Sequence, residues 1–201
     1  MNNGVTLLKP HILGIAGSPR RNGNTDRLLR EAIKAMAETG YSTEIINIRD
    51  LQFSPCLGCN ACSKTGQCVQ KDDIQYLQER LVAADRIIVA APVFFMGINA
   101  QTKAVIDRMQ TFWALKYVFK QPVITESERL PRYGLFLSAA GTRFPDVFTC
   151  AERAIKNLYH VLDIKYYGSC AYKGIDQAGE IDLHPSAFSE VHAKALALAQ
   201  L

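Results

Sequence analysis

The chain has 201 residues, and its 48% hydrophobic and 21% charged residues are typical of a globular protein and exclude a largely disordered one. This length suits a single domain, residues 1–201, with a full hydrophobic core. A formal net charge of +4 does not by itself indicate nucleic-acid binding, and no apolar run approaches the roughly 20 residues needed to span a bilayer.

Strands and helices are predicted to alternate along the chain. Apolar runs of strand length predict strands at 11–17, 42–48, 86–92, 133–141 and 164–172. Apolar residues at helical spacing predict helices at 24–40, 72–85, 99–119, 146–162 and 185–200. Asn24 or Thr25 is expected to cap the first helix, and Gly40 to end it. The segment 120–132, which contains two prolines, is predicted to be a loop.

Strands that are joined by helices of this length pair in parallel, because such a crossover cannot be a tight hairpin. The five units therefore predict an α/β fold. We expect a three-layer, doubly wound sandwich whose five-stranded parallel sheet has the order 2-1-3-4-5 and helices on both faces. Ligands of such sheets bind beyond the carboxyl ends of the strands, so function is expected in the loops 17–25, 91–99 and 140–147.

The first of these loops, GSPRRNGNT at 17–25, leads from a strand directly into a helix. Free backbone N–H groups and the positive end of the helix dipole suit a phosphate at such a place. Ser18, Asn24 and Thr25 add short donors, and Arg20 and Arg21 can offset the phosphate charge. Neither the Walker A pattern nor the G-x-G-x-x-G fingerprint is present, and an ordinary capped turn is the alternative interpretation.

The second loop, APVFFMGINAQTK at 91–103, combines aromatic side chains with backbone N–H groups near Met96 and Gly97. Such a loop suits a planar heterocycle, although Phe94, Phe95 and Met96 taken alone are interpreted as core residues. The third loop, SAAGTR at 138–143, offers small residues over which a ring could lie flat.

A cysteine-rich loop is predicted at 53–70, where four of the six cysteines fall: Cys56, Cys59, Cys62 and Cys68. The start of the chain lacks a secretion signal, so we expect a cytoplasmic protein, in which structural disulfides are rare. The spacing Cys-x2-Cys-x2-Cys-x5-Cys matches the start of ferredoxin-type [4Fe–4S] ligation better than the paired spacing of zinc sites. Zinc or an empty reduced site, and a thiol/disulfide switch, stay open as alternatives.

Other residues have simpler interpretations. Cys150 and Cys170 stand alone in apolar patterns and are predicted to be core. Lys103 and Asp107, which precede Arg108 on the predicted helix 99–119, are expected to form a surface pair at i,i+4 spacing. The four histidines show no metal-ligand spacing and are assigned no role. An aromatic stripe is interpreted as core or as a subunit interface, and it consists of Trp113, Tyr117 and Phe119.

Taken together, GSPRRNGNT, APVFFMGINAQTKAVIDR and SAAGTR resemble the flavodoxin-like NADPH-dependent FMN reductase superfamily. With CLGCNACSKTGQCVQKDD between the first two, the chain resembles the iron–sulfur flavoprotein branch of that superfamily, over about residues 11–145. This resemblance implies a flavodoxin-like fold and FMN as the cofactor.

The resemblance also implies roles for individual residues. The family's phosphate-loop roles would fall on Ser18, Arg20, Asn22, Asn24 and Thr25. Its isoalloxazine-loop roles would fall on Pro92, Val93, Phe94, Phe95, Met96 and Gly97, with Ala140, Gly141 and Thr142 at the other edge of the ring. The chain departs from the family pattern at Phe94, where tyrosine is frequent, at Met96-Gly97, which replaces a common Gly-Asn pair, and at Asn99, where Ser, Thr or Pro is often found.

The sequence favours a redox flavoprotein in which FMN exchanges electrons with a [4Fe–4S] cluster at the four clustered cysteines. No side chain is required as a general acid or base, and none is assigned. We expect NAD(P)H or ferredoxin as the donor, a small molecule or protein as acceptor, and a homodimer or homotetramer without nucleic-acid or membrane partners. The alternatives are a cluster-free NAD(P)H-dependent FMN or quinone reductase, and a thiol- or metal-binding redox sensor.

Overall fold

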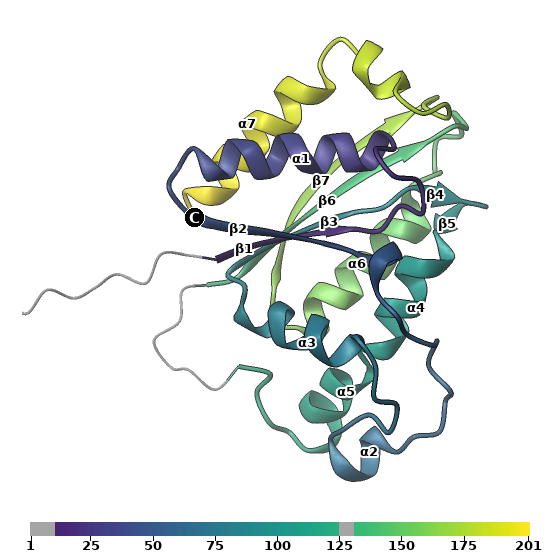
Figure 1. The fold of residues 1–201 in the computed structure, drawn as a ribbon, viewed down its shortest axis with the longest axis vertical. Helices are drawn as coiled ribbons and strands as arrows, with labels where there is room; N and C mark the ends of the chain where they lie inside the picture. The colour runs from purple at the N-terminus through teal and green to yellow at the C-terminus, as the bar shows by residue number, and fades with distance from the viewer. Residues whose placement is uncertain (1–10, 125–130) are drawn as a thin grey trace, which may run out of the picture.

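The computed structural model describes residues 11–124 and 131–201, which form a three-layer α/β sandwich (Figure 1). Its central sheet has five parallel strands in the order β2-β1-β3-β6-β7. These strands are β1 (His11–Ala16), β2 (Ser42–Asn47), β3 (Arg86–Ala90), β6 (Tyr133–Ala140) and β7 (Lys165–Lys173). Counted along the chain, this is the predicted order 2-1-3-4-5, so the predicted fold class is confirmed.

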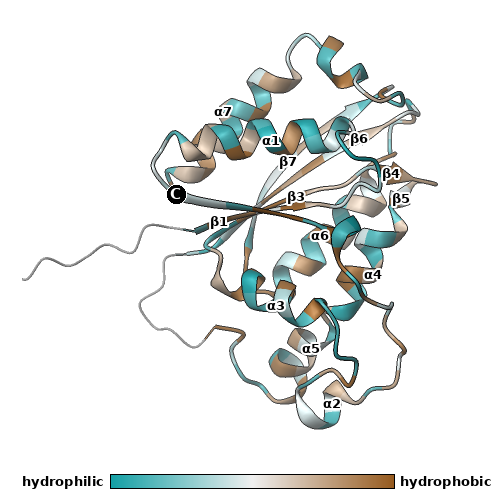
Figure 2. Ribbon diagram, viewed as in Figure 1, coloured by the Kyte–Doolittle hydropathy of each residue, from teal (hydrophilic) through white to brown (hydrophobic). Residues whose placement is uncertain are grey.

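Helices cover both faces of the sheet. On one face lie α1 (Asn24–Ala37) and α7 (Ala187–Ala199), and on the other lie α3 (Ile74–Ala83), α4 (Ala100–Arg108) and α6 (Thr149–Val161) (Figure 1). Successive side chains of β1 point to opposite faces, so that Ile12 packs with the α1 and α7 side chains and Leu13 with those of the other face. Both faces of the inner strands are therefore buried, which explains their continuous apolar sequence (Figure 2).

The predicted helix 99–119 is interrupted. It consists of α4, then α5 (Gln110–Trp113), then a π-helical turn η2 (Ala114–Val118), and the break falls at Met109, where ψ is 7°. A π turn has a longer repeat than an α-helix, so residues after the break leave the face that the regular spacing assigned to them. Trp113, Tyr117 and Phe119 are all exposed, so their interpretation as core is wrong, while their interpretation as a subunit interface stays a prediction.

Several local features differ from the prediction or were missed. The N-cap of α1 is Gly23 rather than Asn24 or Thr25, and the helix ends at Ala37, three residues before Gly40. The missed elements are all short: the hairpin strands β4 (Val93–Phe94) and β5 (Gly97–Ile98), the helix α2 (Cys62–Thr65), and the 3-10 turns η1 (Ile48–Asp50) and η3 (Glu180–Leu183). Across the two described segments, no helix combines the length and hydropathy of a membrane span.

Candidate functional site

The loop between β1 and α1 presents free donors at the carboxyl end of the sheet. Ser18 and Thr25 are buried, and the Thr25 hydroxyl has no hydrogen-bond partner among the described residues. The backbone N–H groups of Asn24, Thr25 and Asp26 likewise donate to no residue of the described chain, as expected for the first turn of a helix. A buried hydroxyl without a partner is costly, and a phosphate at this helix N-terminus would satisfy it. The loop therefore fits a phosphate group.

Other predicted phosphate contacts are engaged within the protein. The Asn24 side chain donates to the Gln177 carbonyl at 2.9 Å and accepts from the Gly179 N–H at 2.9 Å. Arg20 donates to the carbonyl of Asp176 at 2.9 Å. These bonds tie the loop to the segment after β7.

The remaining polar side chains of the loop differ in whether they already have a hydrogen-bond partner. Asn22 adopts a left-handed φ of 56° and accepts from Arg30 through its side chain. The Ser18 hydroxyl accepts the Arg20 N–H at 3.1 Å. Of the polar side chains predicted to contact the phosphate, Thr25 alone lacks a described partner. It is the strongest candidate for a direct ligand contact.

Arg49, which the sequence analysis missed, holds the same loop from behind. It lies in η1 and donates to the Ser18 carbonyl at 3.1 Å and to the Asp26 carboxylate at 2.8 Å. The Asp26 carboxylate in turn accepts the Asn22 N–H at 3.1 Å. Arg49 follows the predicted second strand directly, so its place at the carboxyl end of the sheet was the one available signal. It fixes the loop's conformation, and its buried Nε atom has no hydrogen-bond partner among the described residues.

The second loop contacts the first through two side chains next to α4. Asn99, fully buried, donates to the Gly17 carbonyl at 2.7 Å, and the Thr102 hydroxyl lies 3.2 Å from the same oxygen. A Cβ on Gly17 would lie only 2.2 Å from the Thr102 oxygen, so this approach requires glycine. Residues 17–25 and the start of α4 are thus in direct contact at the edge of the sheet where the first two loops are predicted to lie.

The predicted ring-contacting residues form a projecting hairpin. Pro92 and Val93 lead into it, and its two-residue turn consists of Phe95 and Met96, with φ of 47° and 63°. Both turn positions are left-handed, a conformation that favours Asn or Gly and strains larger residues. Phe94 and Phe95 are exposed, so their interpretation as core residues is wrong. Gly97 begins the return strand β5.

The third loop joins the other two at the same sheet edge. Ala140, at the end of β6, is buried and accepts the Ile175 N–H at 3.0 Å. A Cβ on Gly141 would lie 3.0 Å from Asp176, the residue whose carbonyl accepts from Arg20. Thr142 follows and is half-buried. The structure therefore brings all three predicted loops together.

The cysteine-rich loop follows β2 at the same edge of the sheet, and contacts between residues 52–54 and residues 72–73 close its two ends. We call these two segments the neck of the loop. Gln52 and Asp73 exchange two hydrogen bonds, one from each backbone N–H, at 2.7 and 3.2 Å. Asp72 forms a bidentate ion pair with Arg108 of α4, at 2.7 and 2.9 Å. Burial opposes the charge on Arg108, but Asp72 and the nearby Cys68 outweigh it and raise the pKa of Arg108.

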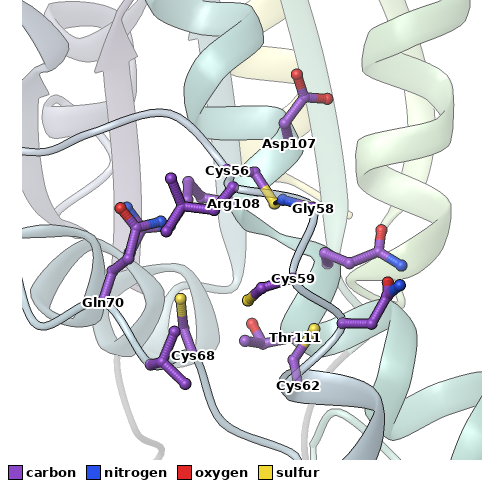
Figure 3. A pocket seen from close by; sticks show the side chains of 13 residues that line it. Cys56, Gly58, Cys59, Cys62, Cys68, Gln70, Asp107, Arg108 and Thr111 are labelled. Carbon is purple, nitrogen blue, oxygen red and sulfur yellow. Dashed lines mark hydrogen bonds between the residues drawn. The ribbon is translucent and has the colours of Figure 1, made fainter.

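The four clustered cysteines line one pocket of about 320 Å³ (Figure 3). Burial raises the pKa of the Cys62 thiol, and the nearby Cys56 and Cys68 thiols add to that rise. All the cysteines are free, including Cys59. Four thiols are the donor set of an iron–sulfur cluster, so the chemistry of the pocket lining fits that group. Within the described residues no three His, Cys, Asp or Glu side chains are arranged to hold a metal ion, and the ligand set stays a prediction.

Of the remaining predictions for single residues, some are confirmed and one is wrong. Cys170 is buried as predicted, but Cys150 is exposed in the first turn of α6, so its assignment to the core is wrong. Lys103 and Asp107 form the predicted surface pair at 2.7 Å. Arg108, one residue later, is buried.

Comparison with known proteins gives consistent results. The sequence model of the family described as NADPH-dependent FMN reductase matches residues 10–166. An iron-sulfur flavoprotein of Methanocaldococcus jannaschii is 45% identical over 97 residues, which cover 48% of this chain and 50% of that protein. One of Methanosarcina thermophila is 35% identical over 132 residues, which cover 66% of this chain and 64% of that protein. The chain spans about half the length of several curated relatives that it matches.

Solved structures agree in fold. An NAD(P)H:quinone oxidoreductase from Methanothermobacter marburgensis superposes with a TM-score of 0.66 at 15% identity, over 96% of both chains. A structure named flavone reductase superposes with a TM-score of 0.69 at 20% identity, over 94% of this chain and 62% of the other. At these identities the likeness shows the fold alone.

Proposed function

This chain belongs to the NADPH-dependent FMN reductase family, and from that premise we propose that it is an FMN-dependent oxidoreductase that couples the flavin to a [4Fe–4S] cluster. When bound, FMN can accept two electrons and release them singly, and a [4Fe–4S] cluster carries one electron at a time. The chain's own residues would hold the two groups close together.

The residues for the flavin come from three loops. Thr25 and the free N–H groups that begin α1 would hold the phosphate, with Ser18 beside them. The hairpin at Phe94 and Phe95 offers exposed aromatic surface for the ring. Ala140, Gly141 and Thr142 keep side chains small at the opposite edge, so that a ring can approach the backbone.

The residues for the cluster are Cys56, Cys59, Cys62 and Cys68. Their thiols line one pocket, and this observation supports the cluster most directly. The names of the iron-sulfur flavoproteins among the relatives point the same way. The pocket and the flavin loops flank a single helix, because Asn99 precedes α4 and Arg108 ends it.

No side chain in these loops is proposed as a general acid or base. NAD(P)H or ferredoxin is proposed as the electron donor, and a small molecule or protein as the acceptor. A nicotinamide would have to stack on the flavin, since the chain shows no separate dinucleotide fingerprint. The exposed aromatic side chains of α5 and η2 are compatible with a homodimer or homotetramer, which stays a proposal.

Anaerobic purification with metal and flavin analysis tests this function. We expect brown protein with about four irons and one FMN per chain. Cys62→Ser should abolish iron binding and keep FMN, whereas Thr25→Val should weaken FMN binding and keep iron. Yellow protein without iron would instead indicate a cluster-free FMN or quinone reductase. Protein with neither group after gentle handling would refute the proposal and favour a thiol- or metal-binding sensor.

A further inference from the structure

Arg108 is a buried cation that contacts both ends of the cysteine-rich loop. It is 2% exposed, and its guanidinium donates to the Ser54 carbonyl at 2.7 Å, just before Cys56. The same guanidinium binds both oxygens of Asp72, just after Cys68. One side chain on α4 therefore holds in place the two chain segments of the neck.

Arg108 also borders the pocket of the four thiols. Of the residues that line that pocket, it is the sole Lys or Arg among those the structure describes, and Asp107 is the sole carboxylate. Its Nε atom is buried and has no hydrogen-bond partner among the described residues. The guanidinium thus keeps donor capacity after its contacts with Ser54 and Asp72 are counted. A permanent charge with a spare donor lies at the wall of a site whose ligands are anionic when they bind metal.

Asp72 determines how strongly the charge of Arg108 raises the electrostatic potential in the pocket. It is paired with Arg108 at 2.7 Å, with side chains that are 1% exposed for Arg108 and 15% for Asp72. A half-buried carboxylate paired with a guanidinium partly cancels the positive potential of the guanidinium at more distant groups, and it holds the guanidinium in one orientation. Removing Asp72 and removing Arg108 would therefore change the potential at the thiols in opposite directions, although both changes open the neck.

We propose that Arg108 is a positioning residue for the iron–sulfur cluster, which sets the conformation of the cysteine-rich loop and favours the reduced state of the cluster by its positive charge. This inference rests on the proposed function, because it needs the cluster to be present. One-electron reduction adds one negative charge to the site and breaks no bond, and the electron comes from the FMN or donor named above. A nearby cation stabilises that added charge, and hydrogen bonds and charge around the sulfur ligands tune such potentials.

The test compares cluster potentials by anaerobic redox titration, followed by electron paramagnetic resonance, in wild type and variants. Arg108→Gln should make the equilibrium constant for one-electron reduction about tenfold smaller, which is a fall of about 59 mV. Asp72→Asn, which leaves the guanidinium uncompensated, should raise the potential. Arg108→Lys keeps the charge and should restore most of the wild-type value. Lys64→Gln, which removes an exposed cation from the same loop, is the matched control and should leave the potential unchanged.

A second readout measures the loop itself. Arg108→Gln and Asp72→Asn should both release iron to a chelator about tenfold faster than wild type, since both open the neck. A purely structural role for Arg108 would move the two potentials in the same direction or not at all, and either result overturns the inference. If Arg108→Gln does not fold, the sign of the Asp72→Asn shift decides. Wild-type protein without iron would instead overturn the proposed function, so the two failures are distinguishable.

Discussion

Thr25 illustrates what a single side chain reveals about a ligand. Its hydroxyl is buried in the first turn of α1 and has no partner among the described residues, whereas both polar side-chain atoms of the neighbouring Asn24 are hydrogen-bonded to the segment 177–181. The sequence suggested both residues as phosphate donors with equal weight. It could not separate them, because the partners of Asn24 lie more than 150 residues away along the chain.

We therefore expect Thr25→Val, which keeps the shape and removes the hydroxyl, to weaken FMN binding tenfold to a hundredfold. A hydrogen bond to a charged group contributes about 1.5–3 kcal/mol, and each 1.4 kcal/mol is a factor of ten. Quenching of flavin fluorescence on titration measures the affinity. Thr25→Ser is the control and should bind nearly as wild type does. Equal affinity of the Val variant and wild type would place the phosphate elsewhere.

The Glu44 carboxylate on β2 forms a pH-dependent contact with α3. Burial would raise the pKa of its carboxyl, but hydrogen bonds from Tyr76 and Arg80, with the Arg80 charge, outweigh burial and lower it below 4.5. A lowered folded-state pKa stabilises the fold above the unfolded-state pKa, and this contribution is lost as the pH falls through the folded-state value.

Glu44→Gln should accordingly lower the free energy of unfolding at pH 7, and the difference from wild type should shrink as the pH falls below about 4.5. Urea unfolding at a series of pH values measures it. Glu79→Gln, which removes a carboxylate at an exposed position of α3, is the control. A difference that stays constant down to pH 3 would contradict the assignment.

At the scale of elements, the contact between the first loop and α4 depends on Gly17. Gly17→Ala should lower the free energy of unfolding by about 1–3 kcal/mol, because its Cβ would lie 2.2 Å from the Thr102 oxygen. In a double-mutant cycle monitored by chemical denaturation, Thr102→Ala should recover part of this loss, since it removes that oxygen. Gly40→Ala is an informative comparison, because no atom lies within 4 Å of its added Cβ and only its φ of 81° opposes the change. Strict additivity of Gly17→Ala and Thr102→Ala would refute the contact.

Element types were predictable, whereas their interruptions were not. Apolar spacing identified the helix region 99–119, but nothing in the spacing marks the break at Met109 or the π turn after it. The same limit explains Cys150: the helix α6 begins at Thr149, so Cys150 occupies an exposed first turn instead of the packed face. The hairpin was missed because Phe95 and Met96 occupy turn positions that usually carry Gly or Asn.

At the scale of the whole molecule, the strand order followed from the sequence because parallel pairing and helical crossovers leave few topologies. The meeting of the three loops followed in turn, since they share one edge of the sheet. The hydrogen bonds that hold the loops at that edge could not be predicted from the sequence. Arg49 and Arg108 each join segments that are distant in sequence, and a pattern within one segment carries no sign of such a partner.

Linkage between ligand binding and folding tests whether the two sites are separable. FMN at 100 times its Kd should raise the free energy of unfolding by about 2.7 kcal/mol. Cys62→Ser should show the same increment, because the flavin loops do not include the cysteine-rich loop. Denaturant unfolding with and without FMN measures both values. Loss of the increment in Cys62→Ser would mean that the sites form one cooperative unit.

The length of helix α4 sets the distance between the two sites. Its nine residues extend about 14 Å from the Gly17 contact to the neck of the cysteine-rich loop. Each residue added to it would advance Arg108 by about 1.5 Å and rotate it by about 100°, away from Asp72. We therefore expect the spacing between Asn99 and Arg108 to stay constant among related chains.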